Sequence, residues 1–129
     1  MHIGFTGTRY GLSVEQKMEI KKVLGSYNST TIIVHHGDCI GADTDFHTIC
    51  KEIGIKTIIH PPIDEKLRAF NIGDVILPSK EYIERNHDIV ENTSLLIACP
   101  YDKKKEITRS GTWATIRYAR KLLKKVELI

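Results

Sequence analysis

The sequence predicts an α/β fold: a single Rossmann-like domain in which a mostly parallel sheet is covered by helices on both faces. Short apolar runs such as "TTIIV" and "SLLIACP" do not alternate polar and apolar residues, which is typical of strands that are buried on both faces. Segments with helical periodicity separate these runs, as in a parallel sheet with crossover helices. The chain has 129 residues, the length of one domain, so we expect residues 1–129 to form one unit.

The first strand and helix have clear boundary signals. "HIGFTG" predicts a buried strand over residues 2–7. Ser13, with Gln16 three residues later, is typical of a capping box at the start of a helix, and Gly25 is expected to end that helix. Its apolar stripe is predicted to contain Val14, Met18, Val23 and Leu24.

"TTIIV" and "IKTIIH" predict the second and third strands. Between them a helix is expected to start near Ala42 and to stop at Gly54. The apolar residues at helical spacing in this segment are Ala42, Phe46, Ile49, Cys50 and Ile53.

The second half of the chain is less regular. Residues 63–79 show no clear period, and we expect one short helical turn around "KLRAF". From Lys80 a further amphipathic helix is predicted, "SLLIACP" predicts the fourth strand, and Gly111 is expected to open the last helix. "VELI" predicts a final edge strand. The predicted inner residues of these two helices are Tyr82, Ile83, Ile89 and Val90, and Trp113, Ile116, Ala119 and Leu123.

Composition excludes several classes of protein. Hydrophobic residues make up 41% of the chain and charged residues 27%, as in an ordinary soluble domain. The formal charge of +3 is too small to indicate nucleic acid, but it suits an anionic ligand. Three cysteines without a CxxC pair predict no disulfide framework and a cytoplasmic protein. We find no signal peptide and no apolar run long enough to span a membrane.

Four loops are the expected functional region. In parallel sheets, ligands bind at the carboxyl ends of the strands, near the topological switch point. This rule selects "TGTRYG", "HHGDCIGAD", "HPPID" and "RSGTW", which are also the loops richest in glycine and polar residues. Two independent arguments therefore indicate the same edge of the sheet.

In "HHGDCIGAD", Gly37 and Gly41 allow a ligand to approach the backbone. The helix that follows presents unpaired N–H groups, which favour an anion. Asp38 and Asp43 would repel phosphate, but they suit ribose hydroxyls or a base edge. The alternative is that Asp43 caps the helix and Asp38 makes a turn.

"RSGTW" repeats this pattern. Gly111 and Thr112 offer backbone N–H groups and a hydroxyl to a phosphate, and Arg109 can add a charge-assisted bond. "TGTR" adds Thr8 and Arg9 to the same rim, although Arg9 could equally be an ordinary surface residue.

"ERNHD" places Arg85 beside Asn86 on the helix before the fourth strand. Asn86 lies on the apolar stripe of that helix, where a buried amide must find partners. It therefore bonds either a neighbouring loop or a ligand.

A metal site is a weaker interpretation of the stretch "HHGDCIGADTDFH", residues 35–47. We expect no metal and no cofactor, because the spacing matches no zinc pattern. Cys39 is expected to be a small filler rather than a nucleophile. The residues that raise the question are His35, His36, Cys39, Asp43 and His47.

The motifs "TGTR", "HHGDCIGAD", "HPP", "RN" and "SGTWATIRYAR", in this order, resemble the SLOG superfamily. That superfamily includes the LOG (Lonely Guy) cytokinin-activating phosphoribohydrolases, the DNA-processing protein DprA, and sensor domains for nucleotide-derived signals in antiviral systems. The chain looks most like the small stand-alone YspA-like branch. The match covers nearly all of the chain.

The resemblance implies a domain that binds a nucleotide or a nucleotide-derived molecule. It also implies a homo-oligomer, because LOG-like proteins commonly build their sites near dimer interfaces. By this similarity the "SGT" turn, Ser110 to Thr112, would take phosphate, and the "GDCIGAD" turn would line the nucleotide pocket. Arg85 would match the arginine that the hydrolases use.

One departure from the family pattern bears on catalysis. LOG hydrolases carry "PGGxGTxxE", in which the glutamate assists cleavage of the N-glycosidic bond. Here the run is "RSGTWAT", and Thr115 stands at the position of the glutamate. Threonine cannot supply negative charge or act as a general base near neutral pH. This departure argues against LOG-type hydrolysis and leaves other glycosidic chemistry open.

Two hypotheses follow, and we favour the first. The protein binds a nucleotide-derived signal of the cyclic or ADP-ribose type and acts as a sensor or as a sequestering protein, for example in antiviral signalling. Alternatively, it hydrolyses the N-glycosidic bond of a nucleoside monophosphate or related nucleotide, with Arg85, Asp38 and Asp43 as catalytic candidates. The predicted ligand-binding residues are Gly7, Thr8, Arg9, Gly37, Asp38, Gly41, Ala42, Asp43, Arg85, Asn86, Arg109, Ser110, Gly111, Thr112 and Trp113.

A third idea, binding of single-stranded nucleic acid, is prompted by DprA and by the basic final helix. The chain has 7% aromatic residues and lacks a run of interleaved aromatic and basic residues on which bases could stack. We therefore do not expect nucleic acid as the partner.

Overall fold

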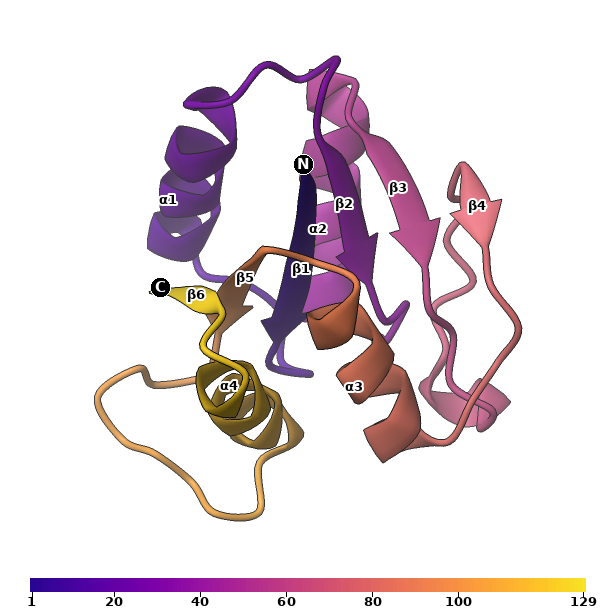
Figure 1. Ribbon diagram of the computed structural model, residues 1–129, viewed down its shortest axis with the longest axis vertical. Helices are drawn as coiled ribbons and strands as arrows, with labels where there is room; N and C mark the ends of the chain where they lie inside the picture. Colours follow the sequence, from indigo (N-terminus) through magenta and orange to yellow (C-terminus); the bar gives the residue numbers. More distant parts are fainter.

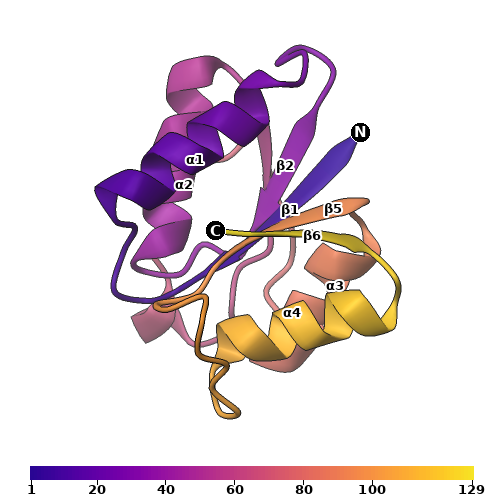
Figure 2. The same cartoon turned by 90° about the vertical axis from the view of Figure 1, so that its left-hand side faces the viewer.

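The computed structural model describes residues 1–129 and confirms the predicted α/β class. Six strands form one sheet in the order β4-β3-β2-β1-β5-β6, and every neighbouring pair is parallel. Helices α1 and α2 cover one face of the sheet, and α3 and α4 cover the other (Figures 1 and 2). The elements are β1 (His2–Gly7), α1 (Val14–Gly25), β2 (Ile33–His36), α2 (Ala42–Ile53), β3 (Lys56–Ile59), a 3₁₀ turn (Glu65–Leu67), β4 (Val75–Ile76), α3 (Tyr82–Glu91), β5 (Leu95–Cys99), α4 (Gly111–Lys121) and β6 (Lys125–Leu128).

The strand order creates a switch point at the centre of the sheet. From β1 the chain adds β2, β3 and β4 on one side, and it then returns to place β5 and β6 on the other. The loops that follow β1 and β5 therefore diverge, since β1 and β5 are direct neighbours. Ligands of open α/β sheets bind in the crevice that such divergence leaves.

Several predicted boundaries are confirmed. β1 ends at Gly7, as expected. Ser13 Oγ accepts a hydrogen bond from the Gln16 N–H, and Gln16 Oε1 accepts one from the Ser13 N–H, which completes the capping box. α2 begins at Ala42 and is followed by Gly54 in a left-handed conformation, which glycine adopts without steric cost.

Six predicted inner residues are exposed: Val14, Met18, Ile53, Tyr82, Ile83 and Leu123. In α1 the buried residues are Ile20 and Leu24, whereas Val14 and Met18 face solvent. This helix packs on the sheet through a narrow stripe, and Ile20 and Leu24, four positions apart, lie on that stripe. Leu123 is 92% exposed because it follows the end of α4 and has a positive φ of 59°.

Ile83, predicted on the inner side of α3, is also exposed; the buried residues there are Arg85, Ile89 and Val90. The two-residue strand β4 was not predicted, since such a short exposed edge strand has no periodic signal. The helical turn expected near "KLRAF" is present as the 3₁₀ turn. None of the helices combines the length and the apolar character that crossing a membrane requires.

β2 also differs from its prediction. It begins at Ile33 and continues through His36, so "HH" belongs to the strand and not to the loop. Because successive side chains of a strand point to opposite faces, His35 and His36 lie on different sides of the sheet. His35 contacts His60, and His36 contacts His47 on α2.

Candidate functional site

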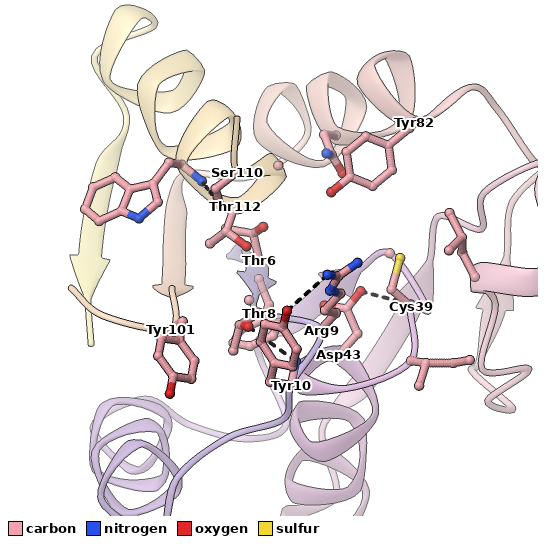
Figure 3. A pocket seen from close by; sticks show the side chains of 18 of the residues that line it. Thr6, Thr8, Arg9, Tyr10, Cys39, Asp43, Tyr82, Tyr101, Ser110 and Thr112 are labelled. Carbon is pink, nitrogen blue, oxygen red and sulfur yellow. Dashed lines mark hydrogen bonds between the residues drawn. The ribbon is translucent and has the colours of Figure 1, made fainter. Parts of the chain in front are cut away.

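A cavity of about 730 Å³ opens at the carboxyl ends of β1, β2 and β5. Its walls come from the β1–α1 loop, the β2–α2 loop, the 3₁₀ turn, α3 and the β5–α4 loop. Figure 3 shows Tyr82 and Ser110 on one side of this space, with Arg9 and Asp43 facing them. The volume is that of a typical small-molecule site.

Most of the predicted ligand-binding residues line this cavity, whereas Asp38, Gly41 and Ala42 do not. None of the residues in "HPPID" lines it either, because β3 ends away from the switch point. The residues that the structure does bring together are Gly7, Thr8, Arg9, Gly37, Asp43, Arg85, Asn86, Arg109, Ser110, Gly111, Thr112 and Trp113.

The sequence reasoning missed three tyrosines in the wall, Tyr10, Tyr82 and Tyr101, and also Lys66 and Leu67. Tyr10 and Tyr101 directly follow strand-end motifs, so the rule that selected the loops could have included them. Lys66 and Leu67 lie in the irregular segment 63–79, where no sequence pattern indicates which side chains face inward.

The start of α4 is open to the cavity. Ser110 is its N-cap, and its Oγ accepts a hydrogen bond of 3.3 Å from the Trp113 N–H. The N–H groups of Gly111 and Thr112 make no hydrogen bond within the protein. Unpaired N–H groups at the positive end of an 11-residue helix attract an anion.

Gly111 has a steric role as well. A Cβ atom at this position would lie 1.9 Å from the Tyr82 hydroxyl oxygen. The α3 tyrosine therefore reaches the first turn of α4 only because residue 111 has no side chain. This contact brings the two helices together at the rim of the cavity.

Arg85 is a buried cation without a carboxylate partner. Its side chain is 3% exposed, and Nη1 donates hydrogen bonds to the carbonyl oxygens of Gly37 and, at 3.2 Å, His60. Nη2 lies 3.5 Å from the Cys39 sulfur, and Nε has no partner. An incompletely bonded buried charge is costly, so the wall formed by Arg85 is poised for an anionic group.

Gly37 makes this placement of Arg85 possible. A Cβ atom on Gly37 would lie 2.0 Å from Arg85 Nη1. The glycine after β2 thus serves the arginine of α3, in addition to lining the cavity.

Asp43 is the only acidic residue that lines the cavity. Its Oδ2 accepts a hydrogen bond of 3.0 Å from the Cys39 N–H. The expected alternative, that Asp43 caps α2, is not observed, since Gly41 is the N-cap and no side chain caps the helix. Burial raises the pKa of Asp43 to about 6, and the Arg85 guanidinium partly opposes that shift. Burial likewise raises the pKa of the Cys39 thiol, which keeps it protonated and a poor nucleophile.

The start of α2 is closed, in contrast to the expectation of an open anion site. The Ala42 N–H donates to the Thr8 carbonyl oxygen at 3.0 Å. Gly41 has φ of 109°, and a Cβ atom there would lie 2.3 Å from the Arg9 carbonyl oxygen. The glycine turn therefore receives the backbone of the β1–α1 loop and not a ligand.

Asp38 lies outside the cavity and anchors the segment 63–79. Its carboxylate accepts hydrogen bonds from Arg68 Nε at 3.0 Å and from the backbone and side chain of Asn71 at 3.0 and 2.8 Å. The segment it holds supplies Lys66 and Leu67 to the cavity wall. Asp38 is thus placed to shape the cavity without touching what lies in it.

Thr115 is buried in α4, and its Oγ1 donates to the Gly111 carbonyl oxygen at 2.9 Å. It does not line the cavity. The side of the cavity formed by α4 therefore has no acidic side chain, and Asp43 approaches from the opposite loop.

The histidines of residues 35–47 form hydrogen-bonded pairs. The Asp38 N–H donates to His36 Nδ1 at 3.0 Å, so His36 must carry its proton on Nε2, which faces His47 Nδ1 at 2.9 Å. Burial lowers the pKa of His36 to about 3. This ring is a neutral structural link between β2 and α2.

A second chain of imidazoles crosses the other face of the sheet. His35 Nε2 lies 2.7 Å from His2 Nδ1, and His35 Nδ1 lies 2.8 Å from His60 Nε2. Burial lowers the pKa of both His35 and His60 to about 4. The histidines are therefore divided between two networks on opposite faces.

No protein-family model matches this sequence, and no curated protein matches it significantly. Solved structures do match. The molybdenum cofactor binding protein of Rippkaea orientalis has a TM-score of 0.74 and 17% identity, covering 98% of this chain and 74% of that one. The Moco carrier protein of Chlamydomonas reinhardtii has a TM-score of 0.70 and 21% identity, covering 99% and 75%.

DNA processing protein A (DprA) of Streptococcus pneumoniae has a TM-score of 0.68 and 20% identity, covering 98% of this chain and 49% of that one. At these identities the likeness concerns the fold. The chain therefore has the same Rossmann-like fold as these proteins.

Proposed function

We propose that the protein binds a phosphate-bearing, nucleotide-derived small molecule in the cavity at the switch point. One observation carries this proposal: the buried guanidinium of Arg85 has an unpaired Nε and lines the same cavity as the open start of α4. A phosphate in the cavity would accept hydrogen bonds from the free N–H groups of α4 and would lie beside the guanidinium, which has no carboxylate partner in the protein.

The charges around the cavity support an anionic ligand. Arg9, Arg85, Arg109 and Lys66 line it, against the single carboxyl of Asp43. Because the pKa of Asp43 is raised to about 6, this residue carries only part of the opposing charge in mildly acidic solution. The four cations together attract phosphate more strongly than the single carboxyl of Asp43 repels it.

The structural neighbours are consistent with ligand binding on this fold. Two of them are named for binding or carrying the molybdenum cofactor, and DprA of Helicobacter pylori is named for a single-stranded DNA binding mode. For this chain we propose a signalling nucleotide of the cyclic or ADP-ribose type. The protein would hold it intact, as a sensor or a sequestering protein, for example in antiviral signalling, and it would act as a homo-oligomer.

The first test is mass spectrometry of the supernatant of the denatured protein, after purification and after incubation with a nucleotide panel. We expect one intact nucleotide per chain. Thr112→Val removes a hydroxyl from the cavity wall with little change in volume and should weaken binding of that nucleotide. Arg120→Gln, on the exposed side of α4, is the control and should bind normally. The proposal would be contradicted if no nucleotide is recovered from the supernatant, or if the wild type and Thr112→Val bind the recovered nucleotide with equal affinity.

The second candidate function is hydrolysis of an N-glycosidic bond in a nucleoside monophosphate or related nucleotide. The position of Asp43 favours it, because this acid shares the cavity with Arg85 and its pKa of about 6 suits proton transfer near neutral pH. Asp38 is no longer a candidate, since its carboxylate is occupied by Arg68 and Asn71 outside the cavity.

Free base and ribose phosphate accumulating beyond one equivalent per chain would establish hydrolysis and exclude simple capture. Asp43→Asn should then abolish turnover while retaining the hydrogen bond from the Cys39 N–H. If turnover persists in this variant, Asp43 is not the catalytic acid or base.

A further inference from the structure

A second cavity of about 550 Å³ adjoins the first, between the start of α1 and the β5–α4 loop. Thr8, Tyr10 and Tyr101 line both cavities. The two spaces therefore meet at this pair of tyrosines. A ligand bound at the start of α4 could extend past the rings without leaving the protein surface.

The tyrosines at this junction have free aromatic surface. Tyr10 is 69% exposed and Tyr101 is 76% exposed, and their rings meet edge to face with centroids 5.7 Å apart. The Arg9 guanidinium donates to the Tyr10 hydroxyl at 3.0 Å and lies 5.1 Å from the centre of that ring. Figure 3 shows both tyrosines at the end of the cavity away from Tyr82. Neighbouring aromatic faces of this kind are platforms on which a nucleobase stacks.

The walls of the second cavity suit a sugar better than a second phosphate. Glu15 and Glu19 lie one turn apart on α1 and both line this space. Their carboxylates accept hydrogen bonds from hydroxyl groups, whereas they repel phosphate. Lys103 and Lys104, from the β5–α4 loop, lie in the same wall and offset part of that repulsion.

From this arrangement we infer that the ligand is dinucleotide-like: two nucleosides joined through phosphates. The phosphates lie between Arg85 and the start of α4, and one nucleoside fills the first cavity beside Tyr82. The second base stacks on the face of Tyr101 with Tyr10 against its edge, and its ribose hydroxyls reach Glu15 and Glu19. This inference rests on the proposed function, because it assumes that the first cavity takes phosphate.

The test compares ADP with diadenosine diphosphate by isothermal titration calorimetry. Both probes carry a diphosphate; diadenosine diphosphate adds a second nucleoside and loses the negative charge of the free terminal phosphate of ADP, so a tighter binding must come from the added nucleoside. We expect diadenosine diphosphate to bind about tenfold more tightly than ADP, the gain from stacking one base. Tyr101→Ala should remove most of the tenfold difference between the two probes, whereas Tyr101→Phe should retain it.

Ile83→Ala is the matched control, since Ile83 is as exposed as Tyr10 and lies outside both cavities; it should bind both probes like the wild type. One outcome separates the two proposals: ADP binds, Thr112→Val weakens that binding, but diadenosine diphosphate binds less than twofold more tightly than ADP. In that case the inference fails and the proposed function stands. A gain that survives Tyr101→Ala also overturns the inference. Absence of binding by both probes overturns both proposals.

Discussion

Helices α2 and α4 both begin beside a glycine that follows a strand of the parallel sheet, yet their first turns meet different partners. At α2 the Ala42 N–H is bonded to the Thr8 carbonyl, and Gly41 packs against the backbone of Arg9. At α4 the N–H groups of Gly111 and Thr112 are free and face the cavity. The same local motif thus packs against the protein at α2 and is open to solvent at α4. The path of the neighbouring β1–α1 loop causes this difference.

The largest expected effect of a substitution is at the closed start. Gly41→Ala would place a Cβ atom 2.3 Å from the Arg9 carbonyl oxygen at φ of 109°, and neither backbone can yield easily. We expect a loss of roughly 3 kcal/mol in the free energy of unfolding, measured by urea denaturation.

Gly25→Ala is the control for that measurement, because a Cβ atom on Gly25 meets nothing within 4 Å and alanine is a better helix former. Its stability should equal or exceed that of the wild type. If Gly41→Ala were equally stable, the close contact at the start of α2 would not exist.

The next largest effect is expected from acid. It should act on the closed start of α2 and not on that of α4, because His36 is hydrogen-bonded to His47 on α2. Its pKa is about 3 in the folded protein and about 6.5 when unfolded. The unfolded chain therefore takes up a proton first, so stability is full above pH 6.5 and falls as the pH falls. At pH 5 His36 should cost about 2 kcal/mol, and His35 and His60, whose pKa values are lowered to about 4, should add to the fall in stability that urea midpoints at pH 7 and pH 5 measure.

Asp43 acts in the opposite direction. Its pKa is raised to about 6, so its contribution is full below its ordinary pKa of 3.8 and is lost as the pH rises through about 6. Between pH 7 and pH 5 it therefore offsets part of the loss from His36. In Asp43→Asn the acid destabilisation should be larger than in the wild type. Stability that does not change between pH 7 and pH 5 in this variant would exclude a neutral buried His36.

The smallest expected effect compares two helix caps. Ser110→Ala and Ser13→Ala each remove a side-chain cap, and each should cost about 1 kcal/mol in the free energy of unfolding. Ser110 lines the first cavity and Ser13 lines only the second, so only Ser110→Ala should also weaken binding of ADP in calorimetric titrations. A matching loss of affinity in Ser13→Ala would mean that binding follows general stability and not the open start of α4.

Local signals account for what could be predicted. The capping box at Ser13, the left-handed Gly54 and the unalternating strands depend on neighbours within a few residues, so the sequence indicates them directly. The site loops were predictable for a second reason: parallel strands bring their carboxyl ends to one edge whatever the details.

Contacts between distant residues could not be predicted. Asp38 is held by Arg68 and Asn71, some thirty positions along the chain, and nothing near Asp38 in the sequence indicates that it turns away from the cavity. Likewise, the closure of the α2 start depends on where the backbone of Arg9 passes. The irregular segment 63–79 has no period, because loops and a two-residue strand form most of it.

Arg85 ties together parts of the protein that would otherwise meet only through the sheet. Its guanidinium, carried on α3, binds the carbonyl oxygens that follow β2 and β3, and the same group faces the cavity. A bound anion would therefore stabilise the hydrogen bonds through which Arg85 connects α3 to the ends of β2 and β3. Occupancy should register as a rise in melting temperature, so heating curves alone could screen a chemical library for the natural ligand.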